Sequence, residues 1–195
     1  MGTPREKPAL DYAAYLELEN ASDERHAFHD GEAYAMAGGT PAHGRLIAQV
    51  SGSLYVALKG KPCMHTSSEQ RVRIGEAHAV YPDAMVVCPP VVRASDDVNA
   101  ITNPVVLVEV LSATTEAWDR GGKFELYRGL PSLRHVVLVR QDAWRVEHFR
   151  RMDDGTWRLS VHGPGDALAL DTVDATLGID DLYDGIEAFG GPPRG

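Results

Sequence analysis

Cysteine is scarce in this sequence, which has only Cys63 and Cys88 among its 195 residues. Two cysteines are too few for the disulfide framework of a small secreted protein. The N-terminus lacks the apolar stretch of a secretory signal, and the sequence has no run of 18 apolar residues that could cross a membrane. We therefore expect a cytoplasmic protein in a reducing compartment that does not insert into membranes.

Basic side chains are also in deficit, with 19 Lys and Arg against 28 Asp and Glu, a net charge of −9. This excludes proteins that coat nucleic acid by bulk positive charge, because such binding is driven by counterion release at basic surfaces. The deficit is uneven: residues 1–119 and 152–195 each carry a net −7, whereas residues 120–151 carry +5. Contact with a phosphate backbone should therefore be local and centred on the basic segment.

A hydrophobic fraction of 44% in a chain of this length is enough to bury a real core. We expect a single domain over residues 10–188. The flanking segments 1–9 and 189–195 are rich in Gly, Pro and charge, and we expect both to be flexible.

The first 60 residues carry three local structure signals. Asp11 is placed to cap a short helix that ends near Asn20. Asp30-Gly31 is the two-residue signal of a hairpin within residues 25–36. Thr40 and Pro41 begin the best-marked helix, whose apolar residues recur at spacings of three and four until Gly60.

The rest of the chain is dominated by strand patterns. Strands are predicted at residues 63–67, 70–74, 80–88 and 105–111, the last two buried and central, and then at 135–139, 144–149 and 157–162. A helix over about residues 115–128 separates the two groups, and a helical turn lies within 180–186. Gly121-Gly122 weakens that helix and suggests a close approach there. This order predicts an α/β or mixed α+β fold with one central sheet.

Two acidic residues interrupt the apolar strands. Glu109 lies within Val105–Leu111, where burial on both faces would strongly disfavour an unpaired carboxylate, so it needs a partner such as a hydrogen bond or ion pair. Asp83 follows Pro82 at the start of another apolar strand, and Pro-Asp alone is typical of a turn. Together, two carboxylates on adjacent buried strands would repel unless a cation lies between them. Hard oxygen ligands suit Mg²⁺ or Mn²⁺.

Lys123 belongs to the helix that follows the Glu109 strand. A helical lysine usually forms i,i+4 ion pairs at the surface, but the short connection here returns the helix near the sheet end that holds the two acids. The histidines show no zinc spacing, since His26 and His29 point to opposite faces of a strand, so no structural zinc site is expected. His43, at a helix start, is either an anion contact or a polar surface residue. No Walker loop, Gly-x-Gly-x-x-Gly or Gly-x-Ser-x-Gly motif occurs.

Four segments resemble the Uma2 family, a bacterial group of restriction-endonuclease-like proteins. They are Asp30–His43, Tyr81–Cys88, Val108–Ser112 and Asp119–Arg128. The resemblance extends over roughly residues 10–185 with the motifs in the right order. It implies a PD-(D/E)XK nuclease fold, in which helices flank a central mixed β-sheet and the active site lies where two central strands part.

The resemblance also implies roles for individual residues. Asp83 would be the Asp of the Pro-Asp motif and Glu109 the following acid. Both would bind Mg²⁺ or Mn²⁺, with the main-chain carbonyl of Val110 as a third ligand. The usual lysine of this fold stands two positions after the acid, where this chain has Leu111. Lys123 matches the family's helix lysine and would have to reach back into the site.

Two more acids, Glu32 and Glu69, match family positions and would be either outer acids of the site or surface charges. The leading hypothesis is a metal-dependent endonuclease acting on DNA, in which Lys123 orients the attacking water or stabilises charge on the phosphoryl oxygens. The alternative is a catalytically weak or inactive module that binds nucleic acid or a protein partner, as Leu111 and the acid surplus favour. A hydrolase of another phosphate ester is a third. Apolar residues such as Trp144 and Trp157 are compatible with a homodimer.

Overall fold

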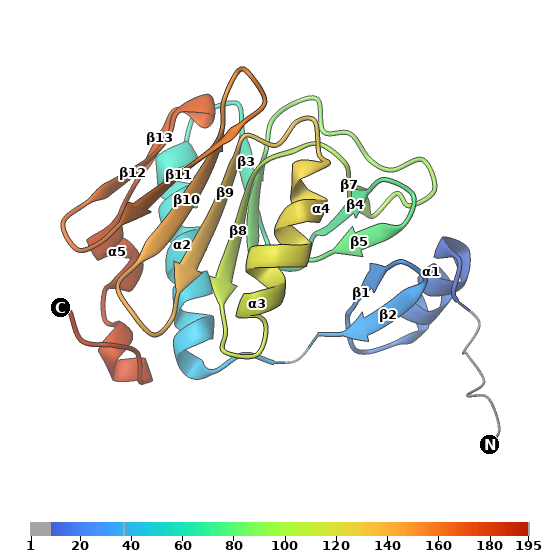
Figure 1. The fold of residues 1–195 in the computed structure, drawn as a ribbon, viewed down its shortest axis with the longest axis horizontal. Coiled ribbons are helices and arrows are strands. Elements are labelled where there is room, and N and C mark those ends of the chain that lie inside the picture. The colour runs from blue at the N-terminus through green and yellow to red at the C-terminus, as the bar shows by residue number, and fades with distance from the viewer. Residues whose placement is uncertain (1–8, 37, 195) are drawn as a thin grey trace.

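The computed structural model describes residues 9–36 and 38–194. A six-stranded mixed sheet forms the centre of the molecule, in the order β11-β10-β9-β8-β6-β3 (Figure 1). Its strands are β3 (Met64–Ser67), β6 (Ala84–Val87), β8 (Pro104–Leu111), β9 (His135–Arg140), β10 (Val146–Arg151) and β11 (Trp157–His162). Strands β8 and β9 are parallel and the other neighbours antiparallel. The internal positions of β6 and β8 explain their almost continuous apolar sequence.

Helices cover both faces of this sheet. In Figure 1, α2 (Pro41–Leu58) lies behind it, and a second helical segment lies in front. That segment consists of α3 (Glu116–Trp118), a π-helical turn η1 (Asp119–Lys123) and α4 (Phe124–Arg128). Because side chains alternate along a strand, Val108 and Val110 of β8 join the core with α2, whereas Leu107 and Leu111 join the core with Tyr127 of α4. Glu109 therefore lies on the α4 side.

A second sheet, absent from the sequence prediction, has five strands in the order β2-β1-β5-β4-β7. They are β1 (His26–His29), β2 (Glu32–Ala35), β4 (Arg71–Ile74), β5 (His78–Val80) and β7 (Ala100–Ile101). Helix α1 (Tyr12–Ala21) packs on this sheet around the small core of Tyr15, Phe28 and Ala79. The β1–β2 turn has positive φ at both Asp30 and Gly31, as the predicted hairpin requires.

The C-terminal part contains a hairpin that the sequence analysis missed. Strands β12 (Ala167–Leu170) and β13 (Ala175–Gly178) are joined by the 3₁₀ turn η2 (Asp171–Val173). They pack with α5 (Ile179–Tyr183) against α2, and a 3₁₀ turn η3 (Ile186–Phe189) follows. The alternating Ala and Leu of β12 form too short a pattern to separate a strand from a loop.

The structure confirms the mixed α/β fold class, the first helix, the hairpin, the long helix and the strand meander. The predicted single central sheet covers only the six-stranded part. The strand predicted at residues 80–88 divides at Pro82 into β5 and β6, because the chain passes there from one sheet to the other. Residues 1–8 of the predicted flexible N-terminus lie outside the described residues. In the C-terminal segment that was also predicted to be flexible, the Pro192 carbonyl accepts a hydrogen bond from the Trp144 indole at 3.1 Å.

Cys63 and Cys88 form a disulfide. They flank the first pair of the β3–β6 ladder, Met64 and Val87, so the bond joins the edge strand β3 to the sheet. The prediction of a reducing compartment was based partly on the scarcity of cysteine, and the disulfide weakens that argument. A cytoplasmic location stays a prediction. No helix within residues 9–36 and 38–194 is long and apolar enough to cross a membrane.

Candidate functional site

Asp83 lies where strands β6 and β8 part. The ladder between them ends at the pair Ala84–Val108, one residue after Asp83 in the chain. Pro82 has no amide hydrogen with which to extend the ladder. Instead, the Val110 amide donates a hydrogen bond to Asp83 Oδ2 at 2.7 Å. The carboxylate therefore takes the place of a backbone acceptor and is held against β8.

Glu109 is 3% exposed and points toward the helical segment in front of the sheet. Its Oε2 lies 2.7 Å from Lys123 Nζ, and its Oε1 accepts a hydrogen bond from the Tyr127 hydroxyl. Burial raises the pKa of Glu109; the Lys123 ammonium opposes this rise, and the Asp83 carboxylate adds to it. The partner that the sequence analysis required for this buried acid is thus Lys123 together with Tyr127.

The π-helical turn places a third acid beside Lys123. Asp119 is buried, and its Oδ1 lies 3.5 Å from Lys123 Nζ. Asp119, Lys123 and Tyr127 follow one another at a spacing of four and share one face of the helix. That spacing is visible in the sequence, but the sequence analysis assigned a role only to Lys123. π-helical turns are rare and often occur at functional sites.

Lys123 stays protonated although it is buried. Burial alone lowers its pKa, but the carboxylates of Glu109, Asp119 and Asp83 raise it by more, so the net pKa is above its ordinary value. Lys123 is therefore a fixed ammonium at neutral pH rather than a proton acceptor. Burial likewise raises the pKa of Asp83, and the hydrogen bond from Val110 opposes that rise.

His43 closes the other side of the site. Its Nε2 lies 3.0 Å from the Val110 carbonyl oxygen and 3.7 Å from Asp83 Oδ2. The ring comes from the first turn of α2, which Thr40 caps by accepting a hydrogen bond from the His43 amide. Of the two sequence alternatives for His43, its position beside the buried acid supports a contact within the site rather than a free surface residue.

A divalent cation fits this set of donors. Mg²⁺ in proteins is usually bound by one or two carboxylates, with water and substrate phosphates completing its coordination. Asp83, Glu109 and the Val110 carbonyl offer hard oxygens, and the acids of the site outnumber its one ammonium. Across the described parts of the chain, Asp83, Glu109 and Asp119 do not bring three ligand atoms within 4.8 Å of one another. An ion here would therefore depend on two carboxylates.

An open hollow of about 480 Å³ lies at the C-terminal end of β8, where Leu111 stands two residues after Glu109. It is lined by Leu111, the last residue of β8, by Ser112, which follows it, and by Thr40 and Ala42 from the start of α2. Gln141 lines it from the end of β9. A ligand in this hollow would meet the end of β8 and the N-terminus of α2, where helix amides favour negative charge.

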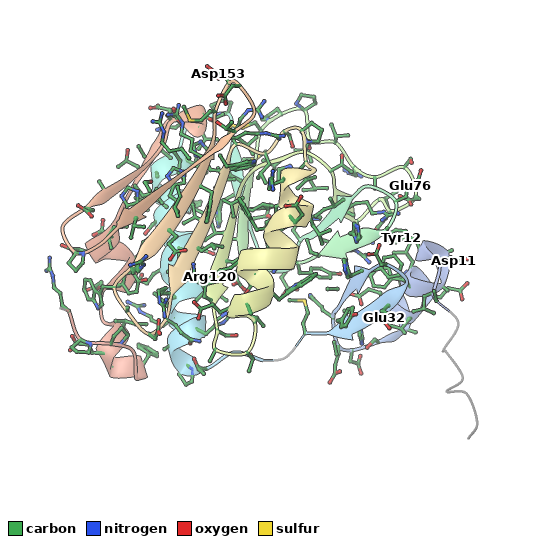
Figure 2. The ribbon with its side chains drawn as sticks, viewed as in Figure 1. Asp11, Tyr12, Glu32, Glu76, Arg120 and Asp153 are labelled. Atoms are coloured by element: carbon green, nitrogen blue, oxygen red, sulfur yellow. A yellow bond between two sulfur atoms is a disulfide. The ribbon has the colours of Figure 1, made fainter. Side chains whose placement is uncertain are left out.

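The two weaker acid candidates contact other parts of the protein. Glu69 is exposed and pairs with Arg25, and Glu32 is exposed and accepts a hydrogen bond from the Tyr34 hydroxyl. Figure 2 shows Glu32 on the N-terminal hairpin, in the five-stranded sheet. These contacts are of the surface-charge kind that the sequence analysis kept as the alternative.

The basic segment is largely neutralised by ion pairs within the chain. Arg120, on the helix in front of the central sheet (Figure 2), pairs with Glu116 and Glu147. Arg140 pairs with Asp142 at 2.6 Å, and Arg145 also approaches Glu147. The excess of basic residues in the sequence therefore does not form a free positive surface of the same size.

Known proteins resemble this chain in sequence and in structure. Residues 12–180 match the Uma2 family, described as "Putative restriction endonuclease". The uncharacterized protein slr1290 of Synechocystis sp. is 34% identical over 180 residues, covering 92% of this chain and 94% of that protein. The uncharacterized protein sll1609 of the same organism is 32% identical over 152 residues, covering 77% and 86%.

A crystal structure from Anabaena variabilis ATCC 29413, a putative nuclease belonging to DUF820, superposes with a TM-score of 0.75. The match covers 91% of this chain and 99% of that chain at 14% sequence identity. At that identity the likeness establishes the fold alone. It confirms the restriction-endonuclease-like arrangement that the sequence predicted.

Proposed function

Because the chain belongs to the Uma2 family of restriction-endonuclease-like proteins, we propose that it is a divalent-metal-dependent endonuclease that hydrolyses phosphodiester bonds in DNA. The observation that carries this proposal is the buried Glu109–Lys123 pair beside Asp83, at the point where two central strands part. Carboxylates and an ammonium at that place are the groups that phosphodiester hydrolysis needs.

Asp83 and Glu109 would hold Mg²⁺ or Mn²⁺, and the Val110 carbonyl would be a third ligand. When bound, such an ion polarises the scissile phosphate and lowers the pKa of a bound water. Asp83 is held for this task by the Val110 amide, and Glu109 by the Tyr127 hydroxyl. Both supports leave carboxylate lone pairs available, since a carboxylate accepts up to about four hydrogen bonds.

Lys123 would act as the charge-stabilising group. Its ammonium is fixed by Glu109 and Asp119, so it can donate to the phosphoryl oxygens as negative charge gathers on them. Its raised pKa argues against a role as general base. Lys123 reaches the site from the helix, which offsets the leucine at position 111 of β8 where this fold usually carries its lysine.

The alternative function is a catalytically weak or inactive module that binds nucleic acid or a protein partner. It is favoured by Leu111 and by the internal pairing of Arg120 and Arg140, which leaves little free positive charge for a DNA backbone. This alternative predicts binding without turnover.

The homodimer remains a prediction. Two apolar residues named in its favour pack within the chain: Trp144 stacks on Tyr183 with ring centroids 5.2 Å apart, and Trp157 lies 5.6 Å from Phe124. These rings are therefore engaged inside one chain and give no support for an interface.

Nicking of supercoiled plasmid DNA tests the proposal. The protein should nick the plasmid in Mg²⁺ or Mn²⁺ and stop on addition of EDTA. Asp83→Asn should abolish nicking while the asparagine oxygen still accepts the Val110 hydrogen bond. Glu69→Gln, a matched change of an exposed acid, should leave nicking intact. Metal-dependent nicking that persists at wild-type rate in Asp83→Asn would exclude this site, and DNA binding without nicking would favour the binding module.

A further inference from the structure

Two histidines meet in the five-stranded sheet, away from the carboxylate site. His29 of β1 and His78 of β5 are partners in the antiparallel register. Their rings stack with centroids 4.8 Å apart, and their Nδ1 atoms lie 3.0 Å from each other. No zinc spacing is visible in the sequence, because His29 and His78 are 49 residues apart and only the strand register brings them together.

A carboxylate completes the cluster. Asp30 Oδ2 lies 3.6 Å from His29 Nε2, and Asp30 Oδ1 lies 3.7 Å from His78 Nε2. These separations are too long for hydrogen bonds. They are close to the roughly 3.4 Å between neighbouring ligands in a tetrahedral zinc site, where metal–ligand bonds are about 2.0–2.1 Å. Within the described residues, this is the group of three potential ligands whose ligand atoms all lie within 4.8 Å of one another.

We propose that His29, His78 and Asp30 bind a transition metal ion of the Zn²⁺ type, at a site distinct from the carboxylate centre and with one position open to water. Two imidazole nitrogens and one carboxylate form a donor set that suits Zn²⁺ and its neighbours better than Mg²⁺. The Asp30 side chain is 65% exposed and that of His29 is 29% exposed, so an ion can enter from solvent. The hairpin turn, which requires the positive φ of Asp30, fixes the backbone of this residue.

The ion would fasten the N-terminal hairpin to the rest of the protein. The ladder between β1 and β5 has two residue pairs, Phe28–Ala79 and His29–His78, and the Asp30 amide donates to the Ala77 carbonyl at 3.1 Å. A metal bond at the second pair would reinforce this short ladder. The small core beneath it contains only three buried residues. A metal that binds only the folded state stabilises that state through its binding free energy.

The site also touches the helix of the carboxylate centre. The Trp118 ring meets His29 edge to face, with centroids 5.1 Å apart. Trp118 directly precedes Asp119 and lies over Gly122, where an added Cβ would be 2.0 Å from the ring. A metal that orders His29 would therefore order the tryptophan at the start of the π-helical turn.

Calorimetric titration with ZnCl₂ tests this site. The untagged full-length chain, stripped with EDTA and dialysed, is titrated in excess MgCl₂, which occupies hard-oxygen sites. One Zn²⁺ should bind per chain. His78→Gln should weaken binding by at least about tenfold. The matched control is His148→Gln, which alters the other stacked histidine pair, His135 and His148, and should leave Zn²⁺ affinity unchanged.

Cobalt supplies a second readout that does not depend on nuclease activity. Co²⁺ in this site should give the visible absorption of a four-coordinate ion and should quench Trp118 fluorescence. The quenching should disappear in Trp118→Phe and persist in Trp157→Phe. Circular dichroism without metal establishes that each variant is folded. The site is overturned if the wild type binds no Zn²⁺ at tenfold molar excess, if folded His78→Gln binds it equally well, or if Glu109→Gln abolishes binding while His78→Gln does not.

Discussion

Two clusters of titratable residues, connected through Trp118, which contacts His29 and directly precedes Asp119, balance their charges in different ways. At the carboxylate centre, Glu109 and Asp119 are buried, and the protein supplies its own cation, Lys123. At the histidine cluster, Asp30 is exposed to water, which solvates its charge, and no lysine or arginine is needed. A buried carboxylate needs an oppositely charged side chain beside it, whereas an exposed carboxylate is solvated by water and can be neutralised by a bound metal ion.

The largest expected effect separates the two clusters. Glu109→Gln should reduce Mg²⁺-dependent cleavage at least 10³-fold, about 4 kcal/mol of transition-state stabilisation, because it removes a charged metal ligand. The same variant should bind Zn²⁺ like the wild type. His78→Gln should do the reverse, losing Zn²⁺ and reducing cleavage by less than about tenfold. Plasmid nicking and calorimetry measure the two properties separately.

This contrast fails in two ways that can be told apart. If Glu109→Gln and His78→Gln both lose cleavage to the same extent, the clusters form one functional unit. If both lose Zn²⁺ and neither loses cleavage, the carboxylate centre is not catalytic. Glu69→Gln, which alters an exposed acid paired with Arg25, controls for nonspecific effects of removing a carboxylate.

Lys123→Met tests the internal cation and should be the next largest effect. Loss of one donor to the developing charge typically lowers the rate 10²–10³-fold, about 3–4 kcal/mol. The Mg²⁺ concentration for half-maximal cleavage should not rise, since the ammonium competes with the metal for Glu109. The exposed lysine variant Lys59→Met is the control. A metal requirement that rises sharply, with an unchanged maximal rate, would make Lys123 a support for metal binding instead.

The sequence predicted the part of this architecture that local patterns encode. Thr40-Pro41 and Asp30-Gly31 gave a helix start and a hairpin because capping and turn chemistry act within a few residues. Glu109 was identified because a carboxylate in an apolar strand is costly. The metal assignment followed from two carboxylates, Asp83 and Glu109, on adjacent buried strands, and Lys123 drew attention because its helix follows the Glu109 strand; the family resemblance then added the role of each residue.

What the sequence could not supply was long-range register. The meeting of His29 with His78 depends on which strands pair, and nothing in either segment fixes that. The division of the strands into two sheets was not predicted for the same reason. Pro82 indicates that a strand ends there, but it does not indicate which sheet the next strand joins. Strand β7, two residues long, is too short to leave a periodic pattern.

Acid should distinguish the partly exposed pair, His29 and His78, from a buried histidine pair. His135 and His148 stack on β9 and β10, and burial lowers the pKa of each to about 4. The charged or titratable groups that face them are His162, Asp171, Arg150 and Arg134. Below about pH 6.5 these histidines take up protons in the unfolded chain but not in the folded pair. The free energy of unfolding is therefore highest above that pH and falls as the pH drops toward 4, by about 3 kcal/mol for His135.

Urea unfolding over this pH range measures the loss. His148→Gln should flatten the dependence, because it removes one of the depressed groups. His78→Gln should leave the pH dependence close to that of the wild type. Burial also lowers the pKa of His78, but the ring is partly exposed, so water still solvates its charged form and the contribution to stability is small. Parallel pH curves for the wild type and His148→Gln would remove the buried pair as the cause.

The smallest effect concerns the contact between the two clusters and uses neighbouring glycines as a matched pair. Neither Gly121 nor Gly122 has a positive φ, so alanine suits the backbone at both. Gly121→Ala meets no atom within 4 Å and should stabilise the helix by about 0.5–1 kcal/mol. Gly122→Ala should cancel that gain, because its Cβ displaces the Trp118 ring from His29, and Co²⁺ should then quench the tryptophan less. Equal gains in urea unfolding, with equal quenching, would mean that Trp118 does not couple the clusters.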